Sequence, residues 1–275
     1  MASKGPHESD FVKAKECLKT YRCFVALSIT ASIITAILGV LNCSNTIVDA
    51  LLTVITVFSL MAVFRCKRAF NTHFQKAEQT RREGLLDDSF DTRMADTPSE
   101  KYYDTDDIGF GLGKLLANTH ENSMFTASIA DEMIKGPEWR FVAGIALLIV
   151  LAVFNLLKAR AIVAVVDILI THNVLNDYLD LKELRSEAVT VQEKCKDAAT
   201  AALEEHWKLS EKTNGKIINA FLRYETALSY ASIILSQKVY DRMNDDLTKK
   251  WEGIKKRYYT EEVSADEKQI KNDLD

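Results

Sequence analysis

The sequence has no strong excess of charge of either sign. Its 39 acidic residues are nearly balanced by 35 lysines and arginines, which gives a formal net charge of -4 at pH 7. Binding to a DNA or RNA backbone depends on a basic surface that neutralises phosphates. The composition therefore argues against a nucleic-acid polymer as a partner.

The chain also lacks the motifs of metal sites and of enzymes. Its five cysteines form no Cys-x-x-Cys pair, and none has a histidine at the spacing of a zinc site. No HExxH, G-x-S-x-G, Walker A or dinucleotide-binding motif occurs. We therefore expect isolated thiols, no metal, no cofactor and no enzymatic activity.

What the sequence does contain is long apolar runs without charge. Residues 23–41 and 47–64 are each long and apolar enough to be a transmembrane helix, joined by the short polar link 42–46. Small residues recur along the first run and predict close helix packing, and Asp49 is expected near the membrane surface. A basic cluster follows at Arg65, Lys67, Arg68, Lys76, Arg81 and Arg82. The positive-inside rule then places this end, and the N-terminus, in the cytoplasm.

A second transmembrane hairpin is predicted from residues 141–157 and 161–176, separated by the charged turn 158–160. The alternative is one long helix that crosses the membrane once. Asp167 interrupts the last apolar run, where a carboxylate costs about 2.5–3.5 kcal/mol to insert. It is either a functional group facing the bundle interior or a carboxylate that is protonated or paired with Arg160 or His172.

The remaining regions predict cytoplasmic helices. An amphipathic helix is expected over 114–133, ended by Gly136-Pro137. Two apolar stripes predict an antiparallel, coiled-coil-like hairpin with its turn at Asn214-Gly215. The stripe positions are Leu184, Ala188, Val191, Cys195, Ala198 and Ala202, then Ile217, Phe221, Tyr224, Leu228, Ala231 and Leu235. The predicted regions are 1–22 (cytoplasmic helix), 23–64 (first hairpin), 65–138 (cytoplasmic helix and acidic loop), 139–175 (second hairpin) and 176–275 (helical hairpin and tail).

Three groups of polar residues are candidate binding sites. The acidic loop could hold a divalent ion, although a solvated loop fits its irregular spacing better. Its acidic residues are Asp87, Asp88, Asp91, Asp96, Glu100, Asp104, Asp106 and Asp107. Tyrosine pairs near Tyr102 and Tyr258 could stack on a nucleobase or simply pack. The densest polar group could recognise a ligand or pack between helices, and consists of Asn118, His120, Glu121 and Asn122.

This layout resembles the SMODS-associated four-transmembrane effectors of bacterial conflict systems. The local matches are DDSFDT at 87–92 and an element with Gln237, Tyr240 and Arg242 within LSQKVYDRMNDDL. The resemblance implies an oligomeric inner-membrane protein with cytoplasmic termini. It also implies that the protein senses a second messenger, such as a cyclic oligonucleotide, and permeabilises the membrane in antiviral defence, together with a neighbouring defence protein.

We thus expect an all-α membrane protein with four transmembrane helices, acting as a pore-forming or membrane-perturbing effector. The alternatives are a cation channel or transport component that uses Asp167, and a membrane-anchored scaffold that docks a partner through its C-terminal helices. The candidate ligand-binding residues are Asn118, His120, Glu121, Asn122, Gln237, Tyr240 and Arg242. Asp49 and Asp167 are the candidate polar groups of the membrane region.

Overall fold

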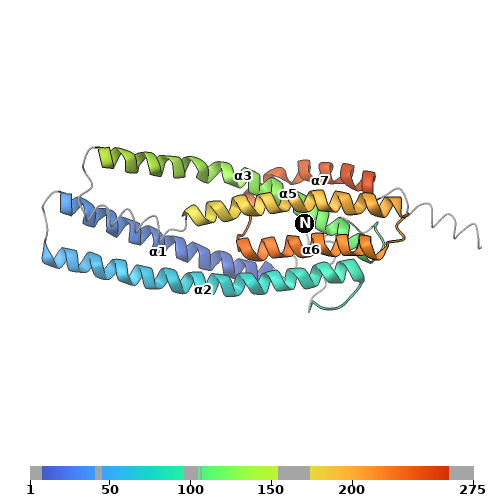
Figure 1. The fold of residues 1–275 in the computed structure, drawn as a ribbon. Coiled ribbons are helices and arrows are strands. Elements are labelled where there is room, and N and C mark those ends of the chain that lie inside the picture. The colour runs from blue at the N-terminus through green and yellow to red at the C-terminus, as the bar shows by residue number, and fades with distance from the viewer. Residues whose placement is uncertain (1–7, 41–44, 96–104, 106, 154–173, 260–275) are drawn as a thin grey trace, which may run out of the picture. The chain divides into compact units, whose positions relative to one another are not determined.

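The computed structural model describes residues 8–40, 45–95, 105, 107–153 and 174–259. All regular secondary structure in these ranges is helical, which confirms the predicted all-α class. The helices are α1 (Glu8–Val40), α2 (Thr46–Phe90), α3 (Leu112–Val153), α5 (Val174–Glu204), α6 (Glu211–Ala231) and α7 (Gln237–Tyr258) (Figure 1). Asp167 and residues 161–173 of the predicted fourth crossing lie outside the described residues.

The chain divides into two compact units. The first, here called the hairpin unit, comprises Ser9–Gln75 and Ile134–Leu179. The second, the bundle unit, comprises Met1–Glu8, Lys76–Met133 and Asp180–Asp275. The helices α2, α3 and α5 each contribute residues to both units, so continuous helices connect the two units.

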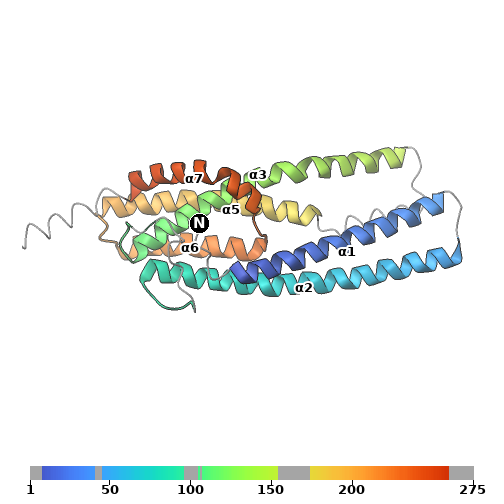
Figure 2. The same ribbon diagram turned by 180° about the vertical axis from the view of Figure 1, so that it is seen from behind.

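In the hairpin unit, α1 and the first half of α2 lie side by side (Figures 1 and 2). The rings of Phe24 and Phe58 meet edge to face across the two helices, with centroids 6.3 Å apart. Small side chains are prominent among the buried positions, including Ala14, Ser28, Ala31, Ser32 and Ser59. Small residues let helix backbones approach closely, as the composition of the first apolar run predicts.

Two helices are long and apolar enough to cross a membrane, at Ser9–Thr35 and Thr46–Phe90. Only 22% and 17% of their most apolar stretches are buried, whereas the core helix of a soluble protein would be mostly covered. Large apolar side chains stand exposed along α2, at Ile47, Leu51, Val54, Phe58, Met61 and Phe64. The structure thus identifies two candidate spans among the residues it describes, and the two further predicted crossings stay a prediction.

The predicted helix end at Gly136-Pro137 is wrong, because α3 continues to Val153. A proline inside a helix removes one backbone hydrogen bond and crowds the preceding turn, which usually kinks a helix. Helix-forming sequence continues on both sides of this proline, and one lost hydrogen bond does not end so long a helix. The amphipathic helix predicted over 114–133 is therefore the first half of α3.

In the bundle unit, the predicted stripe of α5 is the buried face of that helix. All six of its residues are at most 1% exposed: Leu184, Ala188, Val191, Cys195, Ala198 and Ala202. On α6, Ile217, Tyr224 and Ala231 are also buried. The two helices form the predicted antiparallel hairpin (Figure 1). Their core is shared with α3 and α7, through residues such as Met124 and Trp251, so the hairpin is part of a larger bundle.

The predicted turn at Asn214-Gly215 is also wrong, since both residues lie inside α6. The chain turns earlier, between Glu204 and Glu211, where the Glu205 carboxylate accepts hydrogen bonds from the Ser210 backbone and hydroxyl at 2.8 and 2.7 Å. Ser210 in turn accepts a bond from the Thr213 backbone and caps α6. A single glycine weakens a helix without ending it, whereas a satisfied cap fixes where the helix begins.

Candidate functional site

Two members of the predicted polar group on α3, Asn118 and His120, lie in a buried segment of the bundle unit. From Lys114 to His120 every residue is at most 4% exposed, so this segment is covered on all sides. Polar groups in such a position must find partners within the protein. The positions of Asn118 and His120 are therefore set by two different sets of neighbours.

Asn118 belongs to a buried network that joins the end of α2 to the start of α3. Its amide nitrogen donates to Asp88 Oδ2 at 2.8 Å, and its amide oxygen accepts from the Thr105 hydroxyl at 2.6 Å. The Lys114 ammonium lies 3.2 Å from the other oxygen of Asp88. Each member thus has an opposite charge or a hydrogen-bond partner, as a stable buried network requires.

The segment DDSFDT at 87–92 fixes the end of α2. The Asp87 carboxylate accepts hydrogen bonds from the Thr92 hydroxyl at 2.7 Å and from the backbone of Met94 and Ala95 at 2.7 and 2.8 Å. Asp91 takes a left-handed backbone conformation, with φ of 53°. These contacts show how the segment turns the chain after α2, and the Asp88 network continues from it.

His120 is enclosed by aromatic rings. Its Nδ1 shares a hydrogen bond of 3.1 Å with the Tyr259 hydroxyl, and Trp251 lies edge to face at 5.7 Å. Burial, together with the positive charge of Lys196, lowers the pKa of His120 to about 4, so the ring is neutral at pH 7. Its Nε2 and the Trp251 Nε1 have no hydrogen-bond partner among the described residues.

The remaining candidates lie where α3 meets α7. The Arg242 guanidinium pairs with Glu132 of α3 at 2.7 Å, and Tyr240 packs near Phe125 with ring centroids 6.1 Å apart. Burial, and secondarily the charge of Glu121, raises the pKa of Tyr240. Tyr240 and Arg242 are only two positions apart on α7, so their side chains leave the helix in different directions.

Two further candidates lie on these helices. Gln237 donates to Asp241 at 2.9 Å within α7 and is solvent-exposed, and Asn122 is half-buried on α3. The structure thus brings Glu121, Tyr240 and Arg242 to one helix contact. It places Asn118 and His120 in separate buried networks.

The acidic loop and the membrane-region acids are only partly described. Asp107 pairs with Lys255 at 2.5 Å, and Asp87 and Asp88 are engaged as above. Asp96, Glu100, Asp104 and Asp106 lie outside the described residues, as do Tyr102 and Asp167. Among the described residues no group of His, Cys, Asp and Glu is arranged to hold a metal. Asp49 lies in the first turn of α2, where a negative charge stabilises the helix.

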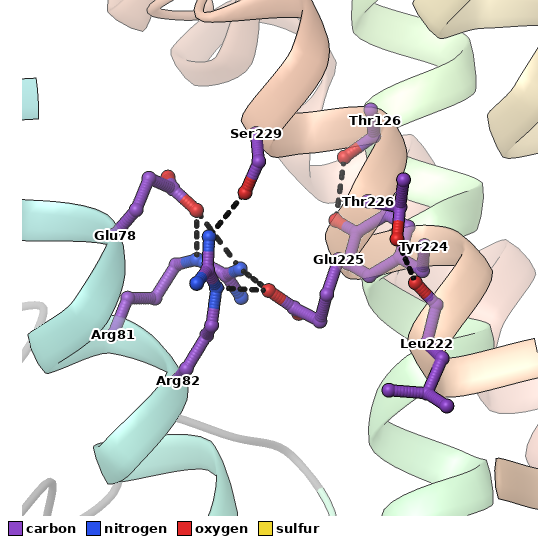
Figure 3. Close-up of polar contacts among 9 residues, drawn as sticks. All are labelled: Glu78, Arg81, Arg82, Thr126, Leu222, Tyr224, Glu225, Thr226 and Ser229. Atoms are coloured by element: carbon purple, nitrogen blue, oxygen red, sulfur yellow. Dashed lines mark hydrogen bonds and ion pairs between the residues drawn. The ribbon is translucent and has the colours of Figure 1, made fainter. Parts of the chain in front are cut away.

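A buried cluster of charges that is not predicted from the sequence joins α2 to α6 (Figure 3). We call it the Arg81 cluster, and it consists of Glu78, Arg81, Arg82, Glu225 and Ser229. Glu225 Oε2 accepts from Arg81 at 2.5 Å and from Arg82 at 2.9 Å, and Arg81 also pairs with Glu78 at 3.0 Å. Arg82 donates to the Ser229 hydroxyl as well.

Three of the four charges of the Arg81 cluster are largely withdrawn from water, Arg82 is about one third exposed, and the four charges balance one another. The side chains of Glu78, Arg81 and Glu225 are 6%, 11% and 8% exposed. Next to them, the buried hydroxyls of Tyr224 and Thr126 share a hydrogen bond of 2.9 Å, which connects α6 to α3. Two arginines face two carboxylates, so removing either carboxylate leaves an uncompensated buried charge, which typically costs about 3–5 kcal/mol.

The signal for this cluster was present in the sequence but ambiguous. Arg81 and Arg82 belong to the run of basic residues that the positive-inside rule assigns to a membrane surface. Glu225 follows the stripe residue Tyr224 directly, which marks it as the edge of a buried face. Only the fold shows that these residues, over 140 positions apart, meet.

No protein family, curated protein or solved structure matches this chain.

Proposed function

We propose that the chain is a membrane effector in which a cytoplasmic signal changes the bundle unit and α2 transmits that change to the membrane. The observation that carries this proposal is the composition of α2. Its first half is an exposed apolar span, and its last turns carry three charged residues of the Arg81 cluster. One continuous helix is thus suited to lipid at one end and fixed by buried charges at the other.

A buried charge cluster is a suitable switch because it has two distinct states. Either Glu225 pairs with Arg81 and Arg82, or these groups separate and are solvated, and intermediate distances are costly. A signal that binds the bundle unit more tightly in the separated state shifts the population toward that state. Release of α2 from α6 would then allow the apolar helices to rearrange.

The finer features of the proposal follow the resemblance to the four-transmembrane conflict effectors. In this proposal the chain makes four crossings of the inner membrane with both termini in the cytoplasm, and it assembles as a homo-oligomer. The signal is a second messenger such as a cyclic oligonucleotide, and the outcome is membrane permeabilisation during phage infection. The cation-channel hypothesis stays a prediction because Asp167 is not among the described residues, and docking of a partner by the C-terminal helices stays a prediction as well.

The test is to weaken the cluster and to measure membrane potential in bacterial cells that express the full chain. Glu225→Gln removes the shared carboxylate and is expected to depolarise the membrane without any signal. The matched control is Glu187→Gln, which removes a carboxylate from an exposed pair with Arg223 on the same helical hairpin. That control is expected to keep the membrane potential of the wild type.

Immunoblots of the membrane fraction must show equal amounts of both variants. If Glu225→Gln is degraded, Arg82→Gln provides a milder weakening of the same cluster, since Arg81 still pairs with Glu225. The proposal is contradicted if the weakened variants accumulate in the membrane and cells keep a normal potential. It is equally contradicted if Glu187→Gln depolarises cells as strongly as Glu225→Gln.

A further inference from the structure

A polar groove of about 380 Å³ lies between α5 and α6, wholly within the bundle unit. We call it the lysine groove, and its lining residues are Lys194, Asp197, Lys212, Gly215, Lys216 and Asn219. The volume is in the range of small-molecule sites, about 300–1,000 Å³. The lining contains no large apolar side chain, so it suits a charged ligand better than a hydrophobic one.

The charge of the groove is positive although the chain as a whole is negative. Three ammonium groups face one carboxylate, and the formal net charge of the protein is -4. The Lys216 ammonium lies 3.3 Å from Asp197 and is compensated by it. In the part of the chain that the structure describes, Lys194 and Lys212 form no ion pair, so two positive charges stand uncompensated beside the cavity.

The lysines of α6 are also placed against the preferences of their own helix. Lys212 is the second residue of α6, where the helix dipole favours a negative charge. Lys216 follows one turn later, so the two like charges repel each other. Violations of local rules without a structural gain are concentrated at functional sites, and a bound anion would relieve both effects.

Gly215 adds space to the groove at the point between these two lysines. Its φ is not in the left-handed region, and a Cβ built on it would meet no atom within 4 Å. Neither backbone conformation nor close packing therefore requires a glycine here. Its effect is to leave the groove open where Lys212 and Lys216 flank it.

From these observations we propose that the lysine groove binds a small phosphate-bearing ligand of about mononucleotide size. Phosphate oxygens would accept hydrogen bonds from the ammonium groups of Lys194 and Lys212, and the Asn219 amide can serve a second polar group of the ligand. The inference that this groove receives the cytoplasmic signal rests on the proposed function. Binding of the ligand to the groove can be measured independently of membrane leakage.

Titration calorimetry with inorganic pyrophosphate tests the site on the full chain in phosphatidylcholine nanodiscs. We expect one site per chain, with an affinity that falls as salt is raised. The double variant Lys194→Gln/Lys212→Gln is expected to weaken binding at least tenfold. The matched control, Lys249→Gln/Lys250→Gln, removes two exposed charges of α7 and should change the affinity less than twofold. Absence of pyrophosphate binding, or equal weakening by both variants, overturns the assignment.

A second pair of variants tests the groove by size and leaves every charge in place. Gly215→Leu adds a side chain to the groove, and Gly253→Leu adds the same side chain to α7, where a Cβ also meets nothing within 4 Å. Both variants are expected to fold with an unchanged or raised Tm. Pyrophosphate binding should be lost at least tenfold in Gly215→Leu alone, and unchanged binding in that variant contradicts the proposed site.

Two more measurements distinguish a lipid headgroup from a free ligand as the source of the phosphate, and distinguish failure of this site from failure of the proposed function. If phosphatidylglycerol in the nanodisc abolishes pyrophosphate binding through the same lysines, the groove binds a lipid headgroup and the small-ligand assignment fails. Equal affinity in both lipids supports a free ligand. If pyrophosphate or a nucleotide binds but Glu225→Gln does not depolarise cells, the site is supported and the proposed function is contradicted. If neither ligand binds but Glu225→Gln depolarises cells, the proposed function is supported and the site is contradicted.

Discussion

The two halves of α2 follow opposite rules of burial. Over residues 47–64, in the hairpin unit, its exposed side chains include large apolar ones such as Val54 and Phe64, while Ser59 is fully buried. In the bundle unit the same helix buries Glu78 and Arg81 against α6. The first half is suited to a solvent less polar than water and the second to a protein interior that accepts charges only in pairs. One helix can therefore suit two environments when the residues on its buried face change from small side chains to paired charges along its length.

The largest expected effect comes from the buried charges. Glu225→Gln should destabilise the bundle unit by about 3–5 kcal/mol, because Arg81 and Arg82 lose their shared carboxylate in a buried site. Thermal unfolding in detergent, followed by the fluorescence of the tryptophans, measures the change. Glu187→Gln breaks an exposed pair and should cost about 1 kcal/mol or less. Equal costs for the two variants would show that the Arg81 cluster is solvated.

A charge placed on the apolar half of α2 tests whether that half is suited to a membrane. Val54→Lys should disfavour membrane insertion by about 3 kcal/mol, since a lysine near the centre of a span has a high transfer cost. The readout is the fraction of protein that resists alkaline extraction from membranes. Leu222, which is 55% exposed on α6, is the matched position in the bundle unit. Leu222→Lys should leave insertion unchanged, and a loss equal to that of Val54→Lys would contradict the assignment.

The buried imidazole of the bundle unit predicts a pH dependence that the hairpin unit does not share. His120 has a pKa of about 4 in the folded protein against an ordinary value of 6.5, because it is buried. Between these two values the unfolded chain binds more protons than the folded chain, so stability falls as the pH falls. The loss approaches about 3 kcal/mol at pH 4 and is absent above pH 7. Denaturant titrations at several pH values should show this slope in the wild type and a smaller one in His120→Phe.

The smallest effect concerns the glycine inside α6. Gly215→Ala should stabilise the bundle unit by about 0.5–1 kcal/mol, because alanine is a better helix former and its Cβ meets open space. The midpoint of urea unfolding is a sufficient readout. Gly253→Ala should give a gain of similar size, and a loss of stability in Gly215→Ala alone would mean that the chain does turn at this residue.

Much of the helical pattern was predictable from local sequence. All six positions that periodicity predicted for the inward face of α5 are buried, because a stripe with spacings of three and four residues is set by helix geometry alone. The predicted helix ends at Pro137 and Gly215 are wrong, because a single residue that disfavours a helix does not end one. The continuity of α3 and α6 depends on the favourable sequence around these residues, which outweighs one poor position.

The sequence by itself determined the helical class, the two apolar runs and the inward face of α5, since each follows from composition or from a repeat along one helix. Tertiary structure decided which charges are buried. Arg81 and Glu225 are separated by 144 positions and pair only because α2 and α6 pack together. The lysine groove likewise needs α5 and α6 side by side. The physical reason is that hydrophobic periodicity acts within a helix, whereas the partner of a buried charge is chosen by the packing of distant segments.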